Sequence, residues 1–209
     1  MSLFDLMTSD DELDAIGIES LSSRAVEGPI FERTKALWAL SRQVTIESLP
    51  QFIETLEDSA LQTPLMFGTL PANQSVIIAL LINSSGEVRL QAERLWFELS
   101  FAERHELKSY LRDDGFELPT LEVEDQALAE AVAVASERLG PAKWIASPLS
   151  NLPGISVRED HPGKKSLVVA SDGSALLMPE SGGSSAELKA FADGARSSDE
   201  DFERRRASG

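Results

Sequence analysis

The most apolar run of the chain, Ser75 to Ile82, is followed by a stretch whose apolar residues recur at helical spacing. The run has eight residues, and a bilayer requires about 20, so the run predicts a buried core element. Asn83-Ser84-Ser85-Gly86 interrupts it. Beyond this break, apolar residues at spacings of four, three and four share one helix face: Val88, Ala92, Leu95 and Leu99.

Residues 76–92 admit two interpretations. The β-branched residues of the apolar run also fit a β-hairpin, with Val76–Ile82 paired to Val88–Ala92 across the Asn-Ser-Ser-Gly break. The helix pair is favoured because the apolar face of the second segment continues to Leu99, which is too long for a typical strand.

Serine followed three residues later by glutamate has the form of a capping box. This spacing predicts three helix starts: Ser84 with Glu87, Ser100 with Glu103, and Ser184 with Glu187. Further helices are expected from Pro29 and from Pro50, because proline is favoured in the first helical turn. Another should run from Glu124 to Leu139 and end at Gly140-Pro141.

The segment from Gly86 to Leu95 resembles the inner helix of a HEAT-type repeat, in which a Val-Arg pair is followed by Ala and Leu at helical spacing. The likeness covers this helix and extends at most to the one before it. HEAT-like packing of the helical body is therefore one possibility. Repeat folds need about three or more units, and no second copy recurs at a fixed period, so ordinary helical packing is preferred.

The pattern changes after Gly140. Ile155–Val157 predicts a strand, and the apolar runs 167–170 and 175–178 flank Ser171-Asp172-Gly173-Ser174. Asp-Gly between apolar runs is the strongest short-range signal for a β-hairpin. With the helix expected after residue 184, these elements predict a small β-β-β-α unit.

Together the patterns predict an α+β fold that is mostly α, with a helical body followed by a small C-terminal unit made of a β-hairpin and a helix. The expected division is an acidic arm or short helix (1–28), the helical body (29–140), the small α+β unit (141–196) and a disordered tail (197–209).

Charge narrows the range of partners. The chain has 19 basic and 35 acidic residues, for a net charge of −16. This excess opposes non-specific binding to nucleic acid or to an anionic membrane, and it favours a basic protein partner. The candidate partner-binding residues lie in two acidic clusters: Asp10, Asp11, Glu12, Asp14, Asp113 and Asp114.

No sequence motif predicts a cofactor, a metal site or catalysis. The chain has no cysteine, which excludes disulfides and thiolate chemistry. It has no phosphate-binding glycine loop and no Gly-x-Ser-x-Gly. The two histidines, His105 and His161, lack the spacing of a zinc helix. No secretory signal is recognised at the N-terminus, so the cytoplasm is the expected compartment.

The leading hypothesis is a cytoplasmic, non-enzymatic protein that binds a basic partner through an acidic surface, such as a toxin-neutralising immunity protein or an inhibitor. A structural or adaptor subunit of a phage or secretion assembly is one alternative. The other is a hydrolase with a site around His161 and Asp172.

Overall fold

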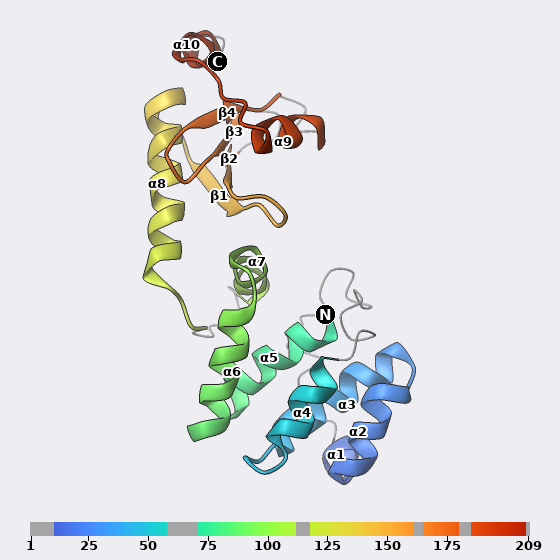
Figure 1. Cartoon of the computed structure of the whole chain (residues 1–209). Helices are drawn as coiled ribbons and strands as arrows, with labels where there is room; N and C mark the ends of the chain where they lie inside the picture. The colour runs from blue at the N-terminus through green and yellow to red at the C-terminus, as the bar shows by residue number, and fades with distance from the viewer. Residues whose placement is uncertain (1–10, 58–70, 112–117, 161–164, 180–184, 208–209) are drawn as a thin grey trace. The chain divides into compact units, whose positions relative to one another are not determined.

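A computed structural model describes residues 11–57, 71–111, 118–160, 165–179 and 185–207 (Figure 1). Its contacts divide the chain into two compact units. Unit 1 comprises Met1–Leu99 and Lys108–Pro119, and unit 2 comprises Ser100–Leu107 and Thr120–Gly209. Helix α7 (Phe101–Leu111) therefore contributes its first residues to unit 2 and its last residues to unit 1.

In its described residues, unit 1 consists of helices joined by short loops and turns. Its helices are α1 (Asp11–Asp14), α2 (Ile18–Glu27), α3 (Ile30–Gln43), α4 (Leu49–Leu56), α5 (Ala72–Asn83) and α6 (Gly86–Glu98). Helix α3 packs against α1, α2 and α5, while α2 also contacts α4 and α5 contacts α6. Pro29 is the N-cap of α3, and Pro50 lies in the first turn of α4, as their positions in the sequence predict.

The apolar run forms the buried helix α5, which confirms the helix pair over the hairpin. Every residue from Val76 to Leu81 is at most 4% exposed. A helix that is apolar on all sides is buried on all sides, so its β-branched residues pack in the core of unit 1 without forming a strand.

One predicted capping box is wrong and another is confirmed. Ser84 ends α5: its hydroxyl donates to the Leu80 carbonyl at 2.6 Å, and its backbone N–H donates to the same oxygen. The N-cap of α6 is therefore Ser85. At α7, the Ser100 N–H donates to the Glu103 carboxylate at 2.7 Å, and the Glu103 N–H donates to the Ser100 hydroxyl at 3.3 Å. The third pair begins at Ser184, outside the described residues.

In its described residues, unit 2 places an antiparallel sheet of order β1-β2-β3-β4 between helices. Its elements are α8 (Glu122–Leu139), β1 (Trp144–Pro148), β2 (Ile155–Glu159), β3 (Ser166–Val169), β4 (Ala175–Leu177), α9 (Ser185–Ala192) and α10 (Asp199–Ala207). Alternation along β3 separates two cores. Leu167 and Val169 pack with the α8 alanines, whereas Val168 packs with Phe191 of α9. The Asp-Gly hairpin is confirmed, and Gly173 has a φ of 79°.

The mostly-α α+β fold is thus confirmed, but the division of the chain differs from the expected one. The continuous part of unit 2 begins at Thr120 and not after Gly140, because α8 packs on the sheet that follows it. The sequence signal at Gly140 marks the end of this helix, where Gly140 has a φ of 96°. Strand β1 was absent from the predicted β-β-β-α unit; its sequence, Trp-Ile-Ala-Ser-Pro, has no clean alternation.

The expected disordered tail instead contains α10. Its single aromatic side chain, Phe202, is 4% exposed and joins the core formed by α8 and the sheet. Arg138 of α8 pairs with Asp199, and Arg206 donates to the backbone carbonyls of Glu137 and Arg138 at the end of α8. A segment this polar predicts disorder, but one buried ring and these arginine contacts hold it as a helix.

A buried ion pair joins α7 to α8 within unit 2. Arg104 donates through Nη2 to Oε1 of Glu124, and each side chain is 7% exposed. No hydrogen bond to the second carboxylate oxygen, Oε2 of Glu124, is found among the described residues. Burial limits the hydration of both charges, and their pairing offsets this cost.

Within the described ranges, no helix is both long enough and apolar enough to cross a membrane.

Candidate protein-binding surface

The predicted partner-binding acids are only partly described by the structure. Asp10, Asp113 and Asp114 lie outside the described residues. The backbones of Asp11 and Asp14 lie in α1, and nothing is described of their side chains. Glu12 lies on the same helix and is exposed. The structure therefore does not test whether these residues form one surface.

A set of exposed carboxylates on the neighbouring helices was not singled out from the sequence. We define the acidic surface as the exposed glutamates of α2, α3 and α4, of the segment between α3 and α4, and of the C-cap of α4: Glu19, Glu27, Glu32, Glu47, Glu54 and Glu57. The basic residues of the same segment are less exposed. Arg24 is exposed, whereas Arg33, Lys35 and Arg42 are half-buried.

Arg33 shows why these bases offset the carboxylates poorly. Its Nε donates to the Ala25 carbonyl at 2.8 Å, so the guanidinium is engaged with the backbone at the end of α2. The carboxylates face water more fully than most of the bases do. The helices of this part of unit 1 therefore present a net negative potential to solvent.

Hydrogen bonding perturbs the titration of Glu47 on this surface. A hydrogen bond from the Thr45 side chain lowers the pKa of Glu47, with a smaller contribution from a backbone hydrogen bond. Its carboxylate therefore stays ionised further into the acid range than an unperturbed glutamate does.

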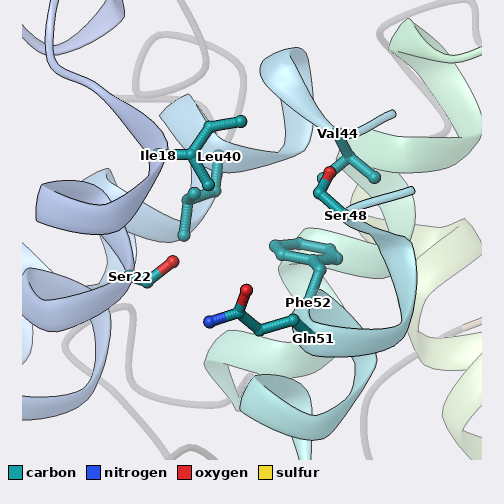
Figure 2. Close-up of a pocket in the computed structure, with 7 residues that line it drawn as sticks. All are labelled: Ile18, Ser22, Leu40, Val44, Ser48, Gln51 and Phe52. Atoms are coloured by element: carbon teal, nitrogen blue, oxygen red, sulfur yellow. The ribbon is translucent and has the colours of Figure 1, made fainter. Parts of the chain in front are cut away.

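A small hollow opens between α2, α3 and α4 (Figure 2). It is lined by Ile18, Ser22, Leu40, Val44, Ser48, Gln51 and Phe52. Its empty space is about 250 Å³ when the open mouth is included, but the enclosed part has room for one water molecule at most. The space is too small for a cofactor, which needs a cleft of roughly 300–1,000 Å³.

The proposed hydrolase site is not assembled by the described residues. The Asp172 carboxylate accepts from the Ser174 backbone N–H at 2.9 Å and from the Ser174 hydroxyl at 2.5 Å. These hydrogen bonds lower the pKa of Asp172 and commit its Oδ1 to the hairpin turn. His161 lies outside the described residues, and His105 makes an edge contact with Phe101 in α7.

The residues of the hollow are far apart in the sequence, so no local motif could reveal it. The available signal was the four-residue spacing of Ile18, Ser22 and Val26, which places them on one face of α2. Among the described residues, no cluster of three or more acidic or histidine side chains could hold a metal ion. No protein-family model, curated protein or solved structure matches the chain.

Proposed function

We propose that the chain works in the cytoplasm as a protein-binding module that engages a basic partner through the acidic surface, in the manner of an immunity or inhibitor protein. The observation that supports the proposal is the unequal exposure of charge on α2, α3 and α4. The six glutamates are all exposed, whereas three of the four basic residues between 18 and 57 are half-buried.

Such an arrangement favours rapid association with a cationic surface. Exposed charges of one sign steer an oppositely charged protein and raise the association rate, and salt screens the effect over about 8–10 Å. Most of the negative excess of the chain also lies in unit 1. No described feature favours the adaptor or the hydrolase alternative over this proposal.

The test is affinity capture with matched charge variants. The surface variant changes Glu19, Glu47 and Glu54 to Gln. The control variant removes the same charge from exposed glutamates of unit 2, at Glu130, Glu137 and Glu203.

We expect the native chain and the control to recover one basic protein in stoichiometric amount, and the surface variant to lose it. Recovery should fall as ionic strength rises. Equal recovery by the two variants would contradict the proposal, as would the absence of any basic partner.

A further inference from the structure

The hollow of Figure 2 lies beside the acidic surface and combines an apolar floor with polar groups at its edge. Ile18 and Leu40 contribute aliphatic surface, and Phe52 contributes a ring that is 4% exposed. The Ser22 hydroxyl and the Gln51 amide point into the space between α2 and α4. A site of this kind can exclude water from an inserted apolar group and still hydrogen-bond to the backbone that carries it.

The size of the hollow restricts what can enter. Because the enclosed space holds about one water molecule at most, only the tip of a side chain can enter it. The open mouth can surround the rest of a small side chain. The dimensions therefore suit the end of a single aliphatic side chain.

The charges around the hollow determine which residues can flank the inserted side chain. On a helix, residues three and four apart are surface neighbours. Glu19 is such a neighbour of Ser22, and Glu54 is such a neighbour of Gln51, while Glu47 is exposed in the turn just before α4. No basic residue occupies an equivalent position around Ser22 or Gln51. The mouth is therefore bordered by carboxylates on both the α2 side and the α4 side.

Apolar exposure continues beyond the mouth on α2. Val26 follows Ser22 by four residues and is 39% exposed. Ile18, Ser22 and Val26 thus form a stripe along one face of the helix. A helical partner segment could contact this stripe while one of its side chains enters the hollow.

We propose that the hollow is the anchor site for one aliphatic side chain of a basic, amphipathic segment of a partner protein. Lysine or arginine residues flanking that side chain would face Glu19, Glu47 and Glu54. The inference rests on the proposed function, because the acidic surface supplies the attraction. The hollow adds the specificity that charge alone cannot give, since anchor residues in desolvated pockets carry most of the energy of an interface.

The test uses two helical peptides of equal length and charge. One carries lysines on one face and leucines on the other, and the second has alanine in place of each leucine. Ser22→Leu should fill the hollow without altering the charge of the protein. Ser20→Leu is the matched control, because Ser20 is exposed on the same helix and does not line the hollow.

The native protein should bind the leucine peptide about tenfold or more tightly than the alanine peptide, which is the gain expected from burying one leucine side chain. Ser22→Leu should abolish this preference, and Ser20→Leu should retain it. On the native protein, the leucine peptide should shift the backbone amide resonances of residues 18–26 and 44–52 more than the alanine peptide does. This measurement does not depend on the folding of any variant.

Equal affinity for the two peptides, or shifts confined to other residues, would overturn the anchor site and leave the acidic surface standing. The anchor site would likewise be overturned if a folded Ser22→Leu protein still preferred the leucine peptide to the alanine peptide. Failure of both peptides to bind at low salt would overturn the proposed function together with the anchor site.

Discussion

The ion pair between Arg104 and Glu124 provides a quantitative test of the packing of unit 2. Replacing Glu124 with Leu keeps much of the side-chain volume but leaves the Arg104 guanidinium buried without its carboxylate. Both side chains are 7% exposed, so water cannot replace the lost partner without opening the structure. Removing one member of a buried pair costs about 3–5 kcal/mol, and an ordinary domain has a total stability of only about 5–15 kcal/mol.

Two further variants separate the charge effect from packing. The double variant Arg104→Met with Glu124→Leu removes both charges, and it should recover most of the lost stability because neither member of the buried pair remains charged. Glu93→Leu breaks the pair between Arg89 and Glu93 on α6, whose side chains are 30% and 34% exposed. An exposed pair four residues apart on a helix contributes only about 0.3–0.5 kcal/mol, so this control should unfold almost as the native protein does.

Urea unfolding followed by circular dichroism gives the free energies. Hydrogen exchange of the α8 amides assigns the loss to unit 2. The reasoning is refuted if Glu124→Leu costs no more than Glu93→Leu, since the pair would then be hydrated in solution. It is also refuted if the double variant is as unstable as Glu124→Leu alone, because the loss would then not arise from separating Arg104 from the Glu124 carboxylate.

Three other outcomes are expected. The Leu81 side chain of α5 is 1% exposed. Leu81→Ala should therefore lower the free energy of unfolding by about 2–5 kcal/mol, measured by urea titration. An unchanged midpoint of the unfolding transition would contradict the burial of this side chain. Hydrogen bonds from the Ser198 side chain and backbone lower the pKa of Asp201. This contribution to stability is therefore present at neutral pH, and it is lost in the acid range as the pH falls through the lowered folded-state pKa. Asp201→Asn should therefore lower the melting temperature at pH 7 more than at pH 3, and an equal shift at both would contradict this. Phe202→Ala should detach α10 from the core of unit 2 at a cost of about 3–5 kcal/mol. Amide hydrogen exchange should then become faster in residues 199–207 but not in β2 and β3. Unchanged exchange in α10 would show that the arginine contacts are enough to hold the helix in place.

The fold was predictable wherever one or two residues impose a local geometry. Gly140 and Gly173 have positive φ values of 96° and 79°, which favour glycine. Gly140 ends α8 and Gly173 lies in the turn of the hairpin, and the sequence predicted both the helix end and the turn. The reciprocal hydrogen bonds of Ser100 and Glu103 are likewise a local device. Ser84 has the same spacing to Glu87, but its hydroxyl bonds back to Leu80. Spacing alone does not determine which backbone group a serine contacts.

The remaining features depend on contacts between residues distant in the sequence. The β-branched residues of α5 would suit a strand equally well, and burial on all sides of the helix decides the outcome. Helix α10 is held by Phe202 and by contacts to α8, which composition cannot show. The hollow gathers Ile18, Leu40 and Phe52 from three helices. The density of acidic residues along the chain cannot reveal a site that tertiary packing assembles from three helices.

Charge and shape should act on different steps of binding. A surface that carries only exposed carboxylates attracts cations with little discrimination, because electrostatic attraction acts before the partners are aligned. The hollow can discriminate only after contact, when a side chain leaves water. Removing the charges of Glu19, Glu47 and Glu54 should therefore slow association with the leucine peptide and weaken its salt dependence, whereas Ser22→Leu should speed dissociation. Stopped-flow measurements at two salt concentrations distinguish these effects. If Ser22→Leu instead changed only the association rate, the hollow would be part of the attracting surface and not an anchor.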